Sequence, residues 1–556
     1  QTYAGANIVG IASGTVIDDI VLRGANIEID DKLTINNALM GNNQTQTGGL
    51  VKTLTNNYGV WTMEGGVLEN YIHNNGNNVD CGIYIKGGTV QNLDLTKYNG
   101  TSYILGGSIE GGTMAGGTLS DVDATDPEAI VTGNGSISNF TVTGTGILSV
   151  ASENTVLSNI TLKGGTIDAK VDISGINIYG GKILGSNAVN DSTIYEATDM
   201  WTSKTYNNLT IDGAAQNIGG GNIFNNLTVN DATLMSYSAG NTINGMTITG
   251  GKTFAQALSD NVFSDVEMYG GKFEVAGTTV VNGIMIDGTA FNTAPGDTSD
   301  NIDGHVSTQL VAYAAGAVVN DMVLRNGGSA FIYNGATANN VTVEKGGVLY
   351  MTNWNQDDGV NGVANGVTVQ DGGYLYYRSG STVNDLTINK GATLDARISW
   401  TDSFAGTYVD GDTVIDYTLN GEEANTFVVT QGTTFLGNYT AAGGSEGGVA
   451  TFDKLYVVEG GSMLGWHLGN TVITEGAYIA NDGTRIEMNW GNLNETGGKH
   501  IQGGYFYKGS AVLGGGSAKL DEATGEVTFT INTLDNVIFD NSLFVAGNVT
   551  KSTNLV

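Results

Sequence analysis

A short motif that returns about every 19 residues constrains this chain more than any other feature of the sequence. In each copy an apolar residue and two small polar residues precede an apolar-Thr-apolar segment and then Gly-Gly, as in VANGVTVQDGG from Val363. The first polar residue of three successive copies is Asn207, Asn225 and Asn244, which gives steps of 18 and 19 residues. A fixed period of this length is typical of a protein built from stacked repeats.

The residues within one copy alternate between apolar and polar. In VLSNITLKGG, Ile160 and Leu162 would point to one side and Thr161 to the other, which predicts a strand. An Asn pair suits a tight corner because Asn tolerates the left-handed backbone, and Gly-Gly suits a turn with positive φ. The second residue after Gly-Gly, such as Ile167 or Leu349, is expected to face the core. Each copy therefore reads as strand, turn, strand, turn, and we expect almost no helix.

A single strand pair cannot bury its own apolar face, whereas a stack of such pairs can. We therefore predict an all-β fold, an elongated single-stranded parallel β-helix, or β-solenoid, with coils about 4.8 Å apart. The repeats cover residues 1–400 and are clearest over 130–395. Residues 401–556 are expected to hold divergent coils and a capping or assembly hairpin region with a loop at Glu522–Gly525. Asn and Thr side chains should align into ladders along the stack.

Composition agrees with this prediction and excludes some functions. Only 2 of the 556 residues are Pro, which leaves backbone N–H groups free to bond between coils. A net charge of −33 repels phosphate backbones, so nucleic acid is excluded as a partner. No stretch approaches 18 apolar residues, so no membrane span is expected. The single cysteine, Cys81, is expected to be buried, and the four scattered histidines to be surface or turn residues.

The repeat resembles the 19-residue strand–loop–strand repeats of AIDA-type autotransporter passengers, which are surface adhesins of Gram-negative bacteria. This resemblance covers roughly half of the chain. It implies a non-enzymatic protein that is secreted or held at a bacterial cell surface, and that works as an adhesin or as a self-assembling filament or surface-layer subunit. The partners it implies are other copies of the chain, a host surface or glycans. The resemblance is carried by the apolar-Thr-apolar strands and by the turns Gly164–Gly165, Gly250–Gly251, Gly327–Gly328, Gly346–Gly347 and Gly372–Gly373.

The alternative is a carbohydrate-active β-helix enzyme, such as a tailspike-like polysaccharide lyase or hydrolase. Hydrolases of this kind need two carboxyl groups about 5–10 Å apart in a cleft. No motif among the 55 acidic residues singles out such a pair. We therefore predict no enzyme activity, and no catalytic or cofactor-binding residue.

One acidic stretch has the composition of a calcium site. Asp297, Asp300 and Asp303 stand close together before Gly304, and carboxylate oxygens at short spacing suit Ca²⁺. The twelve-residue loop pattern with a terminal Glu is missing, so a plain acidic loop is the other interpretation. No other cofactor is expected.

Three neighbouring repeats carry an aromatic residue at the third position after the turn, where a side chain should point outward. Phe331, Tyr350 and Tyr376 would stack on the outer face, and Trp354 would lie close to them. This predicted aromatic stripe either shields the sheet beneath it or contacts sugars or another subunit. A solenoid also ends in unpaired strand edges, so we expect homotypic contacts through at least one terminus.

Overall fold

In a computed structural model, the chain forms two units, Gln1–Met246 and Thr247–Val556. Beyond residue 402 only the backbone strands β47 to β64 are described, apart from a few side chains of β47. The other described residues are 14–23, 28–29, 31–75, 81–123, 131–132, 134–185, 187–198, 203–213, 215–232, 234–250, 254–257, 259–288, 308–351, 362–378, 380–389 and 391–397.

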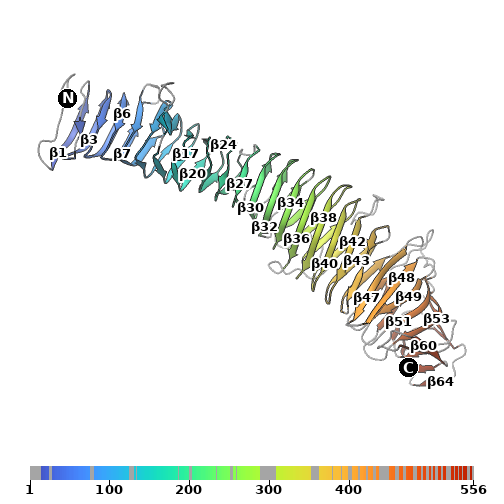
Figure 1. Ribbon diagram of the computed structural model, residues 1–556. Helices are drawn as coiled ribbons and strands as arrows, with labels where there is room; N and C mark the ends of the chain where they lie inside the picture. Colours follow the sequence, from blue (N-terminus) through green and yellow to red (C-terminus); the bar gives the residue numbers. More distant parts are fainter. Residues whose placement is uncertain are drawn as a thin grey trace. The chain divides into compact units, whose positions relative to one another are not determined.

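The described residues form strands and turns and contain no helix, which confirms the predicted all-β class (Figure 1). No helix in this part of the chain is therefore long and apolar enough to cross a membrane. A coil has three straight segments, as in β19 (Val156–Ser158), β20 (Ile160–Lys163) and β21 (Thr166–Ala169). Each segment pairs in parallel with its counterpart in a neighbouring coil, so the predicted β-solenoid is confirmed.

Most strands of the first unit belong to two sheets of stacked segments. The first sheet contains β19 and β20 together with β1 (Thr15–Leu22), β3 (Leu33–Gly41), β5 (Leu50–Tyr58), β7 (Val67–His73), β9 (Thr89–Leu95), β11 (Ser108–Ile109), β12 (Gly112–Met114), β16 (Ser136–Ser138), β17 (Phe140–Thr143), β22 (Ile173–Ser174), β23 (Ile176–Tyr179), β25 (Val189–Asn190), β26 (Thr193–Glu196), β27 (Thr205–Asn207), β28 (Thr210–Asp212) and β30 (Ile223–Asn230). The second contains β21 with β2 (Glu28–Ile29), β4 (Gln44–Gln46), β6 (Val60–Met63), β8 (Gly82–Ile85), β10 (Thr101–Ile104), β13 (Thr118–Ser120), β18 (Ile147–Val150) and β24 (Lys182–Leu184). The unit also holds β14 (Val122–Asp123), β15 (Val131–Thr132), β29 (Ala215–Ile218) and β31 (Leu234–Tyr237).

The second unit repeats this plan after β32 (Thr242–Thr249), which crosses the boundary between the units. Its first sheet contains β34 (Val262–Met268), β36 (Val280–Asp287), β38 (Val318–Arg325), β40 (Thr337–Val343), β42 (Val363–Val369), β44 (Thr382–Asn384), β45 (Thr387–Asn389), β47 (Ser403–Asp410) and β48 (Thr413–Asn420). Its second sheet contains β33 (Phe254–Ala257), β35 (Lys272–Val275), β37 (Gln309–Ala312), β39 (Ser329–Ile332), β41 (Val348–Met351), β43 (Tyr374–Arg378), β46 (Thr393–Arg397), β50 (Thr434–Gly437), β52 (Ser462–Trp466) and β54 (Arg485–Asn489).

The remaining strands of the second unit lie toward its C-terminus. Two strands there, β59 (Ser517–Leu520) and β60 (Val527–Thr530), pair antiparallel, whereas the loop of the hairpin predicted at Glu522–Gly525 lies outside the described residues. The role of this hairpin as a cap stays a prediction. These strands are β49 (Ala424–Val429), β51 (Ala450–Val457), β53 (Thr471–Ile479), β55 (Asn492–Glu495), β56 (His500–Gln502), β57 (Tyr505–Tyr507), β58 (Ala511–Gly514), β59 (Ser517–Leu520), β60 (Val527–Thr530), β61 (Thr533–Asp535), β62 (Ile538–Asp540), β63 (Leu543–Ala546) and β64 (Lys551–Thr553).

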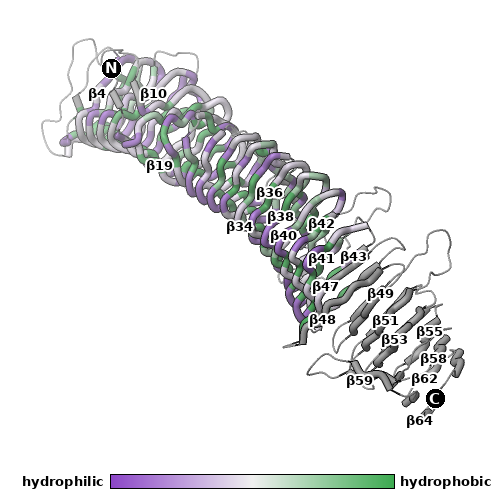
Figure 2. The backbone as a smooth tube through the Cα atoms, turned by 45° about the vertical axis from the view of Figure 1, so that its right-hand side comes forward, coloured by the Kyte–Doolittle hydropathy of each residue, from purple (hydrophilic) through white to green (hydrophobic). Residues whose placement is uncertain are grey.

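The core follows the alternation that the repeat predicts. Ile160 and Leu162 are fully buried, and Thr161 between them is only half-buried. The second residue after a Gly-Gly turn is buried as expected, at Ile167 and at Leu349. Green and purple residues alternate along the coils in Figure 2 because each strand has one face in the core and one outside.

The polar pair of the repeat forms a corner in the coils between Asn139 and Asp385. Its second residue has a left-handed backbone, with φ of 50° at Asn159, 54° at Asp321 and 54° at Asn340. Glycine takes the same place in other coils, with φ of 75° at Gly283 and 65° at Gly366. This confirms the predicted corner, because Asn, Asp and Gly are the residues that adopt this conformation at least cost.

The first residue of the corner builds an amide ladder in the second unit. Asn320 donates from Nδ2 to Oδ1 of Asn282 at 2.8 Å, and Asn339 donates to Asn320 at 2.8 Å. Asn365 and then Asn384 continue the ladder at the same 2.8 Å. Each amide donates to the preceding coil, so the predicted ladder is present and has a direction.

Replacing Asn340 with Asp should destabilise the second unit by about 1–2 kcal/mol at low salt. Asn340 donates to Asp321 at 3.0 Å, so the variant sets two exposed carboxylates against each other. Chemical denaturation at low and high salt measures the loss, which should shrink as salt screens the repulsion.

The matched control is Asn339→Asp, one residue earlier. There the side-chain amides of Asn320 and Asn282 can each rotate so that the oxygen and the NH2 group exchange places. Asn320 then donates a hydrogen bond to the new carboxylate at position 339. We expect a smaller loss than in Asn340→Asp. Equal losses in the two variants would contradict the directional ladder.

Candidate functional site

The predicted aromatic stripe of Phe331, Tyr350 and Tyr376 lies on the outward side of three strands in the second unit, and Val311 continues the row on a fourth. Val311 of β37, Phe331 of β39, Tyr350 of β41 and Tyr376 of β43 pair in register from coil to coil. Phe331 and Tyr350 stack with ring centroids 4.4 Å apart and an interplanar angle of 6°. Tyr350 and Tyr376 are 5.8 Å apart and tilted by 48°. The predicted alignment of the rings is therefore present.

The predicted exposure of these rings is wrong for Phe331 and Tyr350, whose exposed fractions are only 9% and 5%. A lateral row that the repeat did not predict covers them. Tyr313 and Tyr333 stack beside them with centroids 6.0 Å apart. We call the whole set the aromatic layer, and it consists of Val311, Tyr313, Phe331, Tyr333, Val348, Tyr350, Tyr374 and Tyr376.

The stacking also limits what the aromatic layer can bind. The nearly parallel faces of Phe331 and Tyr350 are turned toward each other, so a sugar ring cannot lie flat between them. The half-buried rim, which includes Tyr313, Tyr333 and Tyr376, keeps partial access to solvent. The layer can therefore offer ring edges and rim hydroxyl groups to a partner.

An acidic group borders the aromatic layer on the side of β35. Glu274 pairs with Lys272 at 3.0 Å and accepts a hydrogen bond from Gln256 at 2.8 Å. Burial, with a smaller contribution from the Glu274 carboxylate, raises the pKa of the phenols of Tyr313 and Tyr333. Both hydroxyls therefore stay protonated and can donate hydrogen bonds.

The other predicted site residues lie outside the described residues. They are Trp354 of the aromatic stripe and the candidate calcium ligands Asp297, Asp300 and Asp303. Within the described ranges, no group of three or more His, Cys, Asp or Glu side chains could hold a metal ion.

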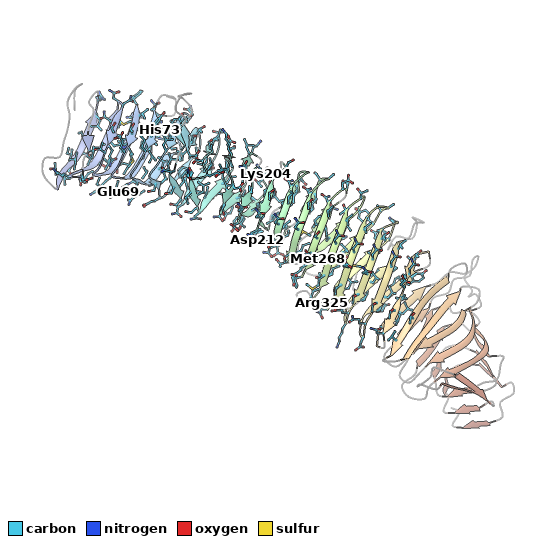
Figure 3. All side chains as sticks on the ribbon, viewed as in Figure 1. Glu69, His73, Lys204, Asp212, Met268 and Arg325 are labelled. Carbon is cyan, nitrogen blue, oxygen red and sulfur yellow. The ribbon has the colours of Figure 1, made fainter. Side chains whose placement is uncertain are left out.

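A polar cluster in the core of the first unit was not predicted from the sequence, and Figure 3 labels one of its members, His73. Asn56 donates to the hydroxyl of Tyr71 at 2.8 Å and to the carbonyl of Gly82 at 3.3 Å. The His73 ring lies edge-on to Tyr98, with centroids 4.5 Å apart. The prediction that His73 is a surface or turn residue is wrong, because only 1% of it is exposed. It stands two residues after buried Tyr71 in β7, and strand alternation could have placed it inside.

His73 is held in its neutral form. Its Nε2 donates to the carbonyl of Asn75 at 2.9 Å, and its Nδ1 has no hydrogen-bond partner among the described residues. Burial lowers the pKa of His73, and the nearby Asp94 only partly opposes this. Protonation would bury a charged N–H group without an acceptor.

Acidification should therefore destabilise the first unit. Because the pKa of His73 is lower in the folded protein than its ordinary value of 6.5, the folded state binds fewer protons than the unfolded state near that pH. The contribution of neutral His73 to the free energy of unfolding is therefore complete above pH 6.5 and is lost as the pH falls below that value. We expect the melting temperature of the wild type to fall by several degrees between pH 7 and pH 5. The variant His73→Leu lacks this titrating group, so its melting temperature should fall less over the same pH range, by the contribution of one bound proton. Identical pH profiles would contradict this assignment.

The buried carboxylates have structural partners. Asp121 accepts from the backbone N–H groups of Ala151 at 2.8 Å and Ser152 at 2.9 Å. Asp287 pairs with Nε of Arg325 at 2.8 Å. These contacts fix turns and hold neighbouring coils together, and they leave neither carboxylate available as a free acid or base.

The buried cation Lys204 is different, because its Nζ has no hydrogen-bond partner among the described residues (Figure 3). Burial lowers the pKa of Lys204, and the charge of Asp168 partly opposes this. The group is thus costly to keep charged, but nothing beside it identifies a substrate.

Comparisons with known proteins provide no family. No protein-family model matches the chain, and no curated protein matches it. Among solved structures, a mutant PL6-family alginate lyase aligns with 97% of this chain and 93% of its own, at 10% identity and a TM-score of 0.17. At that score the alignment has no bearing on the function of this chain. The fold expected from the resemblance to autotransporter passengers is present, and no comparison identifies the family.

Proposed function

We propose that this chain is a non-enzymatic protein of a bacterial surface, secreted or held there, and that it serves as an adhesin or as a self-assembling structural subunit. Its mechanism is geometric. Coils bonded to one another form a stiff element, and side chains on the outer faces meet other copies, a host surface or glycans.

The observation that carries this proposal is the combination of an apolar core with continuous amide ladders. In the second unit, five Asn side chains from Asn282 to Asn384 are linked across successive coils. Such a stack resists bending and separation of its coils, which suits a load-bearing or displaying role. The structural use of Asp121 and Asp287 supports the non-enzymatic part of the proposal.

Electron microscopy of the purified full chain, together with binding to host cells and to immobilised glycans, tests the proposal. We expect filaments, sheets or cell and glycan binding, with no change in the polysaccharides. Release of new reducing ends or of unsaturated sugar products from a polysaccharide would overturn the non-enzymatic role. A monomer that neither assembles nor binds would overturn the adhesive and structural roles.

A chelator should leave the melting temperature of the protein nearly unchanged. The apolar core and the backbone bonds between coils need no metal for folding. Calorimetry with and without EDTA measures this. A large drop that added Ca²⁺ restores, and that Asp300→Asn abolishes, would instead support the calcium interpretation of Asp297, Asp300 and Asp303.

A further inference from the structure

Two tyrosines from neighbouring coils stack on the outside of the first unit. Tyr179 ends β23, and Tyr195 lies in β26, the strand that pairs with β23 in parallel. Their ring centroids are 4.7 Å apart, and the interplanar angle is only 14°. The exposed fraction of Tyr179 is 36%, and Tyr195 is half-buried. This pair is therefore open to small molecules in the solvent, unlike the centre of the aromatic layer.

The backbone keeps these two rings together. Ile178 and Ile194 precede the two tyrosines, pair with each other in register and are fully buried. The register shifts directly after them, so that Tyr179 pairs with Glu196 and Tyr195 is the extra residue of a β-bulge. A bulge interrupts the ladder of backbone hydrogen bonds between two strands. The two rings thus meet at a point where the backbone pairing of the coils is interrupted.

Two other tyrosine pairs show how this one differs. Tyr313 and Tyr333 are also nearly parallel, but their ring centroids are 6.0 Å apart. Tyr84 and Tyr103 are 4.6 Å apart, but they are tilted by 43° and only 8% of Tyr103 is exposed. The pair in β23 and β26 combines a close, nearly parallel stack with access from the solvent.

We propose that Tyr179 and Tyr195 form an oxidative cross-linking site, at which a haem peroxidase with hydrogen peroxide joins the two rings into dityrosine. The peroxidase takes one electron and one proton from each phenol, which leaves two tyrosyl radicals. A carbon–carbon bond forms between the ring carbons next to the hydroxyl groups. The C–H bonds of those two carbons break, and the hydrogens move to the oxygens and restore both phenols. One molecule of hydrogen peroxide takes up the two electrons and two protons and becomes two molecules of water.

The stack favours this coupling because the two radicals do not have to meet by diffusion. The rings must tilt to bring the two carbons within bonding distance, and their exposure leaves room for this movement. The product would tie β23 to β26 covalently where the bulge interrupts their pairing. This proposal does not depend on the proposed function, because it needs only the stacked coils and an oxidant.

The test is oxidation of the full-length protein by a purified haem peroxidase and hydrogen peroxide, followed by trypsin digestion and mass spectrometry. Trypsin cleaves after Lys170, Lys182 and Lys204, so the two tyrosines fall in separate peptides, 171–182 and 183–204. We expect these peptides to be joined, with a mass two hydrogen atoms below their sum. The yield should not change with protein concentration, because both rings belong to one chain.

The matched control is Tyr195→Phe, which keeps a ring in the stack but has no phenol to oxidise. It should give no joined 171–182 and 183–204 peptides. Tyr58 is 55% exposed elsewhere in the first unit, and Tyr58→Phe should leave the yield of these joined peptides unchanged. Peptides joined through Tyr58, identified as those that Tyr58→Phe abolishes, should be at least about tenfold rarer in the wild type.

Circular dichroism shows whether each variant is folded. Similar yields of peptides joined through Tyr58 and through the stacked pair would mean that exposure alone determines coupling, and would overturn the proposal. The absence of joined 171–182 and 183–204 peptides from the oxidised wild type would also overturn it. So would a yield that rises with protein concentration, since the link would then form between copies.

Discussion

Replacing Phe331, Tyr350 and Tyr376 together with Ser should destabilise the second unit by at least about 6 kcal/mol. Phe331 and Tyr350 are almost fully buried, and truncating a buried aromatic side chain typically costs about 3–5 kcal/mol. Hydrogen exchange should become faster first in β39, β41 and β43, because a stacked repeat opens locally. Thermal melting together with hydrogen exchange measures the effect.

The control is the double variant Tyr179→Ser/Tyr195→Ser in the first unit. These rings stack at 4.7 Å and 14°, but Tyr179 is 36% exposed. We expect a loss of about 1 kcal/mol per residue or less. A similar loss in the two variants would mean that ring stacking, and not burial in the aromatic layer, supplies the stability.

A gentler change separates a contact role of the aromatic layer from its structural role. Changing rim tyrosines to Phe keeps the rings and removes the hydroxyls, so the fold should persist. If adhesion and assembly also persist in this variant and in any folded form of the Ser variant, the layer is structural and the contact interpretation is wrong. The rim residues to change are Tyr313, Tyr333, Tyr374 and Tyr376.

Replacing Gly88 with Ala should destabilise the first unit by at least about 3 kcal/mol. Gly88 has a φ of +77°, and a Cβ there would lie only 2.5 Å from the carbonyl oxygen of Gly66 in the preceding coil. Part of the cost is the left-handed conformation of Ala, about 1–2 kcal/mol, and the rest is the separation of two coils.

Gly213→Ala isolates the first of these two costs. Gly213 has a φ of +73°, and a Cβ there would meet nothing within 4 Å. Its expected loss is about 1–2 kcal/mol. Urea denaturation compares the two variants. If Gly88→Ala costs no more than Gly213→Ala, the close approach of the coils at this turn is not a constraint.

The repeat was sufficient to predict the class of fold. The alternation around Thr161 gave the strands, and the Asn pair and Gly-Gly gave the corners and turns, because these conformations depend on one residue and its nearest neighbours. The Asn ladders followed because a fixed period puts like residues above one another. The register even survives the long connection between β36 and β38, where Asn282 still pairs with Asn320.

The candidate site could not be predicted to the same extent. Alternation placed Phe331 and Tyr350 on the outer side of their strands, but their burial depends on Tyr313 and Tyr333 one row to the side. Side-chain packing between rows depends on rotamers and on the path of each turn, and a one-dimensional period contains neither.

The sequence by itself thus determined what repeats in this protein: strands, corners, coil stacking and the residues that line the core. Only the tertiary structure decided what does not repeat. It placed His73 beside Tyr98 inside the first unit and covered Phe331 and Tyr350 of the aromatic layer from the side. The physical reason is that repeated features arise from local conformation and a fixed spacing, whereas these contacts join side chains whose meeting depends on the packing of whole coils.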